Sequence, residues 1–168
     1  MAVTDIDQAI ASEVRSLASA LKSRGWMLAA AESCTGGLIA AACTELSGSS
    51  DWFDRGFVTY SNEAKTELLG VSAELIAQHG AVSEAVARAM VEGALARSHA
   101  QLAVAVTGIA GPTGGTPAKP VGTVWVGLAQ RGQTATATLL QLQGDRAAVR
   151  RQTVAWALRA LNNAASAR

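Results

Sequence analysis

One stretch, residues 27–42, constrains the fold more than any other. A short apolar run ends just before Ser33, and an apolar helical pattern resumes after two glycines. This order predicts a strand over 26–32, a tight turn and a helix over about 35–46. The glycines let backbone N–H groups approach a ligand, and a helix start carries unpaired donors and a partial positive charge. Ser33 therefore lies where an oxyanion would be stabilised, although the stretch alone also allows Ser33 or Thr35 to be only a helix cap.

The composition is that of a single folded domain over residues 1–168. Hydrophobic residues make up 49% of the chain and charged residues 16%, which is enough for a packed core. The formal net charge is +1 and no basic block occurs, so we expect no nucleic-acid partner. The N-terminal residues do not resemble a signal peptide and no segment has membrane-spanning length. We therefore expect a cytoplasmic protein without a membrane partner.

The order of helix and strand patterns predicts an α/β fold. The opening helix stops at Gly25, and the chain ends in a helix that starts near 144–146. Between them the sequence predicts strands over 26–32, 53–60 and 102–107, helices over about 35–46, 61–69, 72–78 and 83–98, and a β-hairpin of 121–128 with 134–142.

A glycine-rich segment follows the buried strand over 102–107. It contains Gly108, Gly111, Gly114 and Gly115, and Lys119 comes shortly after them. Glycine density at such a place indicates either a flexible surface connection or a backbone cradle for an anion. The sequence leaves both alternatives open.

Tyr60 and Lys65 are the residues that could act with Ser33. Lys65 falls in the first turn of a helix capped by Ser61 or Asn62, where the helix dipole disfavours a cation and should lower the lysine pKa. A lysine of lowered pKa can serve as a general base, and Ser with Lys is a known alternative to Ser-His-Asp. Taken singly, Lys65 would more often be a solvated surface residue and Tyr60 a residue at the edge of the core.

Cysteine and histidine offer weaker candidates. Cys34 lies beside Ser33 and is a competing nucleophile. Cys34 and Cys43 lie one predicted helix apart without metal-ligand spacing, so we expect free thiols and no metal site. His79 and His99 fall at predicted helix ends, where we interpret them as structural.

Together, five motifs in order resemble the CinA C-terminal domain family. They are residues 31–37, 56–65, 79–84, 107–124 and 144–150. The resemblance implies a three-layer α/β/α sandwich and, for stand-alone members, nicotinamide-nucleotide amidase activity without a cofactor. In that reaction the carboxamide of nicotinamide mononucleotide is hydrolysed to nicotinate mononucleotide and ammonia. By motif match, Ser33 is the nucleophile, and Lys65 and Tyr60 are its activating partners.

The same reaction needs an oxyanion site and a site for the ribose phosphate. Backbone N–H groups of residues 35–37 are candidates for the oxyanion, and the glycine-rich loop with Lys119 and Arg146 for the phosphate. For Arg146, an ion pair with Asp145 is the plainer alternative. The expected substrate-binding residues are Thr35, Gly36, Gly37, Thr107, Gly108, Gly111, Gly114, Gly115, Lys119 and Arg146.

Two other functions compete with the amidase. Glycine loops bind anions in many proteins without catalysis, so a nucleotide-binding or regulatory module is the main alternative. An interaction domain of a DNA-uptake or repair assembly is suggested by the family name alone. We also expect a homodimer or higher homo-oligomer, because the domain is small and its helices are rich in alanine.

Overall fold

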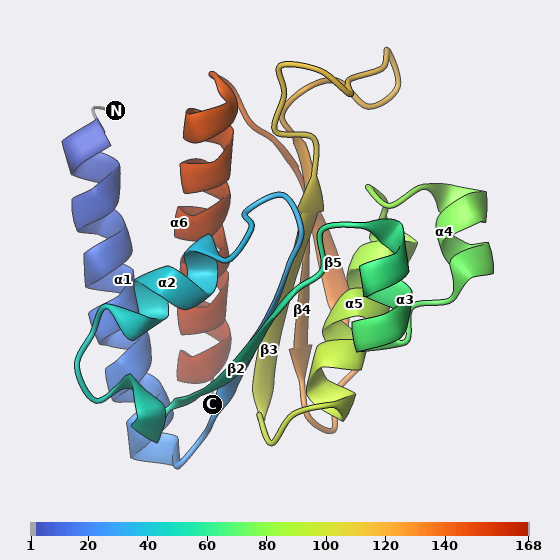
Figure 1. Ribbon diagram of the computed structural model, residues 1–168. Helices are drawn as coiled ribbons and strands as arrows, with labels where there is room; N and C mark the ends of the chain where they lie inside the picture. Colours follow the sequence, from blue (N-terminus) through green and yellow to red (C-terminus); the bar gives the residue numbers. More distant parts are fainter. Residues whose placement is uncertain (1–2, 168) are drawn as a thin grey trace.

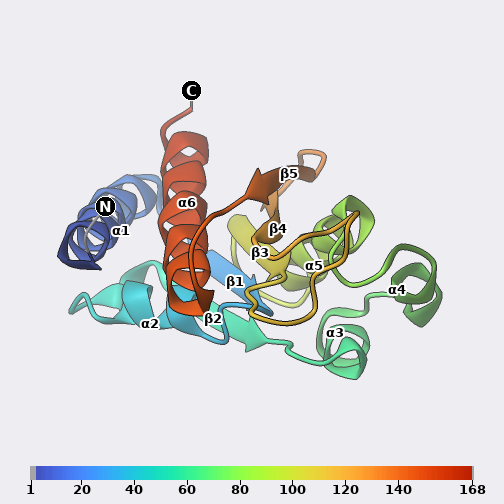
Figure 2. The same cartoon turned by 90° about the horizontal axis from the view of Figure 1, so that it is seen from above.

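The computed structural model describes residues 3–167 and arranges them in three layers (Figure 1). In chain order the elements are α1 (Val3–Arg24), β1 (Leu28–Glu32), α2 (Leu38–Thr44), a short 3-10 turn (Ser49–Asp51), β2 (Phe53–Val58), α3 (Asn62–Leu69), α4 (Ala73–His79), α5 (Glu84–Ala96), β3 (Leu102–Gly108), β4 (Thr123–Gln130), β5 (Thr136–Gln141) and α6 (Arg146–Ser166). Helices α1, α2 and α6 cover one face of the sheet, and α3, α4 and α5 the other (Figure 2). The expected α/β/α sandwich is confirmed.

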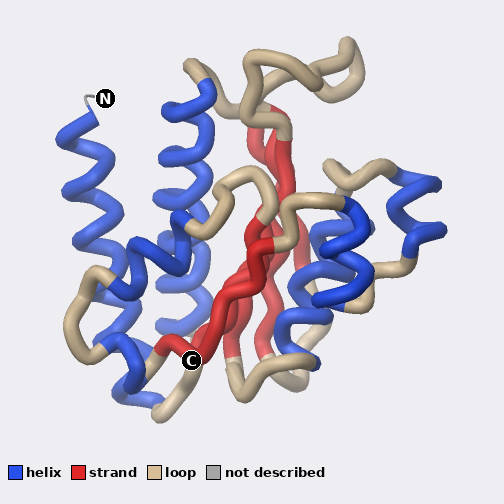
Figure 3. Tube along the Cα trace, in the orientation of Figure 1, coloured by secondary structure: helices blue, strands red, loops and turns tan. Residues whose placement is uncertain are grey.

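The central sheet has five strands in the order β2-β1-β3-β4-β5. β1 pairs in parallel with β2 and β3, whereas β4 pairs antiparallel with β3 and β5. β1 is buried throughout, as is β3 except for its last residue, which is why both read as continuous apolar runs. Because β1, β2 and β3 run in the same direction, the segments that follow them meet at one edge of the sheet (Figure 3). Ligands of open α/β sheets bind at this edge.

Side chains of β1 alternate between the two helical layers. Leu28 and Ala30 pack in the core beneath α1, α2 and α6, and Ala29 and Ala31 in the core beneath α3, α4 and α5. The alternation directs Glu32 toward α2, and the next residue along the chain toward the α3 side. Small alanine side chains on β1 also let both helical layers approach the sheet closely.

The start of α2 differs from the prediction. The helix begins at Leu38, because Gly36 and Gly37 have left-handed φ angles of 58° and 103° and extend the turn. Its N-cap is Gly37, so neither Ser33 nor Thr35 caps it. The capping interpretation of those two residues is therefore wrong.

Other boundaries agree with the sequence more closely. Ser61 caps α3 and Ser83 caps α5 through their side chains, as expected, and Gly70 ends α3 in a left-handed conformation. The hairpin forms, although β4 and β5 begin two residues later than predicted. Within residues 3–167, no helix is both long and apolar enough to cross a membrane.

Candidate active site

Ser33 and Lys65 meet at the edge of the sheet where β1 ends. Ser33 follows β1 directly, and its amide donates to the carbonyl oxygen of Val106 on β3 at 3.0 Å. Lys65 lies in the first turn of α3, as the capping pattern predicted. Its Nζ lies 3.0 Å from Ser33 Oγ. Parallel pairing of β1 with β2 brings together two residues that are distant in the sequence.

The Lys65 side chain is buried although it ends in an amine. Only 1% of the residue is exposed. Helical side chains lean toward the helix N-terminus, so the amine reaches the segment between β2 and α3. There Nζ donates to the carbonyl oxygens of Thr59 at 2.8 Å, Tyr60 at 3.3 Å and Ser61 at 3.4 Å. Burial lowers the pKa of Lys65, which makes its neutral, proton-accepting form easier to reach.

Cys34 is a poorer nucleophile than its position suggests. Burial raises the pKa of its thiol to about 11, so the thiolate is scarce at neutral pH. Cys43 behaves in the same way, since burial raises its pKa to about 12. Both cysteines are free thiols, as expected. The Ser33 hydroxyl is therefore a better candidate nucleophile than the Cys34 thiol, because its Oγ contacts the Lys65 amine.

Tyr60 and Arg146 contact each other at the mouth of the site. The Tyr60 residue is 60% exposed, and its hydroxyl accepts a hydrogen bond from the Arg146 guanidinium at 3.0 Å. A second guanidinium nitrogen donates to the Gly111 carbonyl oxygen at 2.9 Å. Asp145 instead caps α6 by accepting from the Ala148 amide, and no ion pair of Arg146 occurs within residues 3–167. The expected alternative of an Arg146–Asp145 ion pair is therefore wrong.

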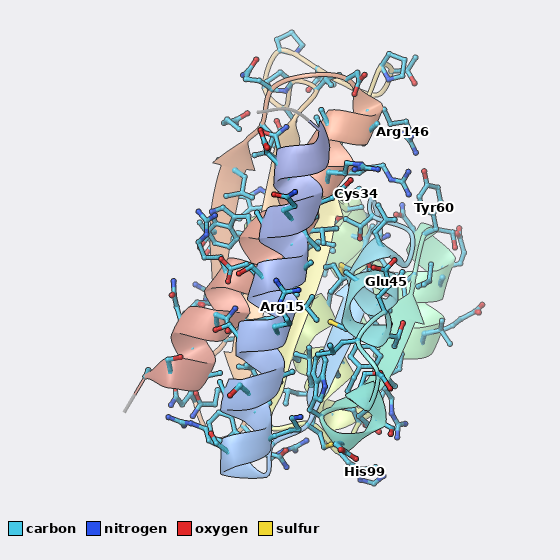
Figure 4. All side chains as sticks on the ribbon, turned by 90° about the vertical axis from the view of Figure 1, so that its left-hand side faces the viewer. Arg15, Cys34, Glu45, Tyr60, His99 and Arg146 are labelled. Carbon is cyan, nitrogen blue, oxygen red and sulfur yellow. The ribbon has the colours of Figure 1, made fainter. Side chains whose placement is uncertain are left out.

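Figure 4 shows Cys34, Tyr60 and Arg146 near one another at one end of the molecule, with His99 at the opposite end. His99 is thus remote from Ser33, which agrees with its interpretation as structural. The amine in contact with Ser33 is that of Lys65, and no histidine lines the cavity around it in the described part of the chain.

A cavity of about 210 Å³ opens between these residues. Of the residues predicted from the sequence, it is lined by Ser33, Tyr60, Lys65, Thr107, Gly108 and Arg146. A neighbouring cavity of about 670 Å³ shares Ala110 and Arg146 with it and is bounded by the start of α6 and by Arg150. A ligand with two parts could therefore occupy both cavities, one on each side of Arg146.

Comparison with known proteins places the chain in a family. Residues 10–165 match the model of the CinA C-terminal domain. The chain belongs to this family. A nicotinamide-nucleotide amidohydrolase PncC from Enterobacter agglomerans is 55% identical over 142 residues, which cover 84% of this chain and 87% of that protein.

Longer proteins and solved structures contain the same CinA C-terminal domain. A putative competence-damage inducible protein of Symbiobacterium thermophilum is 58% identical over 146 residues, which cover 82% of this chain but 34% of that longer protein. The crystal structure of the competence/damage inducible protein CihA from Agrobacterium tumefaciens has a TM-score of 0.89 and 46% sequence identity, and the match covers 92% of this chain and 96% of that one.

Several predicted binding residues lie outside the cavity lining of this CinA C-terminal domain. They are Thr35, Gly36, Gly37, Gly111, Gly114, Gly115 and Lys119. Lys119 Nζ donates to the His79 carbonyl oxygen at 2.9 Å, which ties the glycine-rich loop to the end of α4. A Cβ on Gly111 would lie 2.5 Å from Val121 Cγ1, so this glycine lets the loop pack on its own returning segment. Substrate contacts by these residues stay predictions.

Arg150 is a site residue that the sequence reasoning did not single out. Its guanidinium donates to the carbonyl oxygens of Cys34 at 3.1 Å and Thr35 at 3.0 Å, and so holds the turn that follows Ser33. The one signal in the sequence was its place in the fifth motif of the CinA C-terminal domain. Nothing else in the local sequence distinguishes Arg150, an arginine inside a helix, as a residue that holds this turn.

Proposed function

We propose that the chain is a nicotinamide-nucleotide amidohydrolase that converts nicotinamide mononucleotide to nicotinate mononucleotide and ammonia. The observation that carries the proposal is the 3.0 Å contact between Ser33 Oγ and the buried Lys65 Nζ. A hydroxyl in contact with a lysine of lowered pKa is one arrangement of nucleophile and base that can carry out acyl transfer from an amide. The similarity to the PncC amidohydrolase supports the choice of substrate.

Lys65 acts as the base by direct contact. A neutral amine has two N–H groups and one lone pair. In our proposal the N–H groups donate to backbone carbonyls such as that of Thr59, and the lone pair accepts the Ser33 proton. The Tyr60 hydroxyl is bonded to Arg146, so we assign Tyr60 to holding Arg146 with its side chain and Lys65 with its carbonyl oxygen. A proton relay through the Tyr60 hydroxyl, one way in which Tyr60 could act as the expected activating partner, is then not needed.

The reaction proceeds through an ester of Ser33. As Lys65 takes the hydroxyl proton, Oγ attacks the carboxamide carbon and a tetrahedral oxyanion forms. The Lys65 ammonium then gives its proton to the leaving nitrogen, and ammonia departs. In the second half, neutral Lys65 takes a proton from water, the resulting hydroxide attacks the ester carbon, and the proton returns to Ser33 Oγ as nicotinate mononucleotide is released.

Backbone amides beside Ser33 supply the oxyanion site. In the described structure the Gly36 amide donates to the Ser33 carbonyl oxygen at 3.0 Å, whereas the amides of Cys34, Thr35 and Gly37 donate to no oxygen atom among residues 3–167. We assign the oxyanion to the amides of Cys34 and Thr35, the first two after Ser33, and Cys34 lines the cavity. Relative to the expected residues 35–37, this assignment adds Cys34 and leaves out Gly36 and Gly37. An amide directly after the nucleophile serves in this way in other hydrolases.

Arg146 is our candidate for binding the phosphate. Two of its guanidinium nitrogens donate to Tyr60 and Gly111, and a guanidinium has five N–H groups in all, so donors remain for an anion. The cavity of about 670 Å³ lies beyond Arg146 as seen from Ser33. With the carboxamide at Ser33, the ribose phosphate would extend into that cavity.

Incubation of the purified protein with nicotinamide mononucleotide tests this function. We expect ammonia and nicotinate mononucleotide in equal amounts, and neither product from Ser33→Ala at an unchanged melting temperature. Binding of the nucleotide to the wild-type chain without ammonia release would contradict the amidase and favour the non-catalytic module.

A further inference from the structure

Glu32, the residue before Ser33, carries a buried carboxyl group that the proposed reaction does not use. The residue is 0% exposed, and no ion pair with it forms within residues 3–167. Burying an acidic group without a cation is costly unless hydrogen bonds satisfy it. The hydrogen bonds of the Glu32 carboxyl group must therefore offset the cost of burying it.

Three donors surround the Glu32 carboxyl group. Oε1 accepts from the Thr35 hydroxyl at 2.6 Å and from the Ile39 amide at 2.8 Å, and Oε2 accepts from the Ala40 amide at 3.0 Å. An ionised carboxylate fits this set, because it only accepts hydrogen bonds. The two amides belong to the first turn of α2 and are the groups that an N-cap side chain normally satisfies.

Glu32 provides this cap because the turn cannot. Gly37 occupies the N-cap position with a φ of 103°, and a glycine has no side chain to accept from the helix. Glu32 lies on the other side of the turn, with its backbone fixed in the sheet, where its carbonyl oxygen accepts from the Thr59 amide at 2.8 Å. One side chain thus joins the end of β1 to the start of α2, and Ser33 opens the turn between them.

We propose that Glu32 is a positioning residue for the nucleophile. Its carboxylate closes the turn of residues 33–37 against α2 and so keeps Ser33 Oγ at 3.0 Å from Lys65 Nζ. The inference rests on the proposed function in one respect, that Ser33 is the nucleophile. Placement matters at this scale, because a shift of about 1 Å can lower a rate by about 10²-fold.

Glu32→Gln is the variant that tests the proposal. It keeps the size of the side chain but replaces one oxygen with an amide group. In either orientation that group faces the N–H of Ile39 or of Ala40, so one amide of α2 loses its acceptor. Ser72→Ala is the matched control, because it removes the side-chain cap of α4, also a helix of seven residues, away from the cavity lining.

The readouts are the rate at which phenylmethanesulfonyl fluoride labels Ser33, located by peptide mass, and the kcat and KM for nicotinamide mononucleotide. Both are measured at a temperature where all variants are folded. We expect Glu32→Gln to lower the labelling rate and kcat by about tenfold or more, with KM changed by less than about threefold. Ser72→Ala should stay within about twofold of the wild type in all three quantities.

Labelling of Glu32→Gln at the wild-type rate would overturn the proposal, because a merely structural cap would change stability alone. Should Glu32→Gln fail to fold, Thr35→Val decides, since it removes the bond by which the carboxylate holds a side chain of the 33–37 turn itself. A slower labelling of Thr35→Val supports the proposal, and an unchanged rate overturns it. The labelling reaction needs no nucleotide, so the labelling rates of the variants test the role of Glu32 independently of the substrate. A protein that is labelled at Ser33 but releases no ammonia from nicotinamide mononucleotide would contradict the proposed function alone.

Discussion

At Lys65 two physical effects oppose each other. Burial disfavours the ammonium form, whereas the carbonyl oxygens of Thr59, Tyr60 and Ser61 favour it. The pKa of Lys65 is lowered, so burial dominates. In the proposed mechanism the neutral amine of Lys65 accepts the Ser33 proton, so this balance would set the pH at which the enzyme works.

The expected pH dependence of activity follows from the lowered pKa of Lys65. A base with a lowered pKa becomes competent as the pH rises, so kcat/KM should increase with pH and level off below the ordinary lysine value of about 10.4. A pH profile of ammonia release from nicotinamide mononucleotide checks this. Lys65→Arg should lose activity nearly as fully as Lys65→Ala, since arginine stays protonated. Substantial activity in Lys65→Arg would show that Lys65 supplies only positive charge.

Substitution of Ser33 and substitution of the neighbouring Cys34 should have clearly different effects on activity. Ser33→Ala should lower kcat by a factor of about 10⁴ or more, as for other hydrolases that lose their nucleophile. Cys34→Ala should keep most of the activity, because burial raises the thiol pKa to about 11 and leaves little thiolate. Steady-state rates of the two variants provide the measurement. An inactive Cys34→Ala with an active Ser33→Ala would assign the chemistry to the cysteine.

Among single residues, the position of Lys65 in its helix could be predicted from the local pattern, whereas its pairing with Ser33 could be predicted only from the family resemblance. The first-turn place of Lys65 followed from the Ser61 cap, a local pattern of a few residues. The contact of Lys65 with Ser33 depends on strand pairing between distant segments, which no local spacing encodes. Arg150 escaped notice for the same reason, since its acceptors are carbonyl oxygens of a turn more than a hundred residues away.

At the scale of the elements, the turn between β1 and α2 is where prediction and structure differ most. Apolar periodicity placed the helix start near residue 35, but Gly36 and Gly37 adopt left-handed conformations and delay it to Leu38. In the first helical turn the Leu38 amide donates to the Thr35 carbonyl oxygen and the Ile39 and Ala40 amides to Glu32, so none of them is available for a substrate oxyanion. Periodicity reports which faces are buried; it does not report the sign of φ at a glycine.

Comparing Gly37→Ala with a control glycine should separate the effect of backbone strain on stability from the effect of the turn on kcat. At a φ of 103°, an alanine is expected to destabilise the fold by about 1–2 kcal/mol. The nearest atom to its Cβ is Val58 Cγ2 at 3.6 Å, so the cost is conformational and not a clash. Gly48→Ala is the control, with a φ of 80° and open space around its Cβ. Denaturant unfolding should show similar losses, while only Gly37→Ala lowers kcat; equal kcat values would contradict the role of the turn.

Across the whole molecule the net charge is only +1, yet positive charge gathers at one place. Arg146 and Arg150 both border the cavity of about 670 Å³ beside the one that Ser33 lines, and they outnumber the one acidic residue of its lining, Asp145. Bulk composition correctly indicated a packed domain, and the order of helix and strand patterns its α/β class, but neither could show how charge is distributed around this cavity. An anionic substrate can therefore be accommodated by a nearly neutral protein.

Arg146→Ala tests the assignment of the phosphate. Losing one charge-assisted contact should cost about 1.5–3 kcal/mol, or about ten- to a hundredfold in kcat/KM, expressed chiefly as a higher KM for nicotinamide mononucleotide. Nicotinamide riboside, which lacks the phosphate, should be turned over at the same poor rate by both proteins. Equal losses on the two substrates would mean that Arg146 acts on the fold or on the chemistry through Tyr60.

The most direct test of the account is to trap the ester on the nucleophile. The enzyme is quenched in acid during turnover of nicotinamide mononucleotide, digested, and its peptides are weighed. We predict that the peptide containing Ser33 gains the mass of the nucleotide less ammonia, that fragmentation places the group on the Ser33 hydroxyl, and that Lys65→Ala forms none of it. Attachment to Cys34, or hydrolysis with no adduct on either residue under conditions that preserve esters, would contradict the central claim.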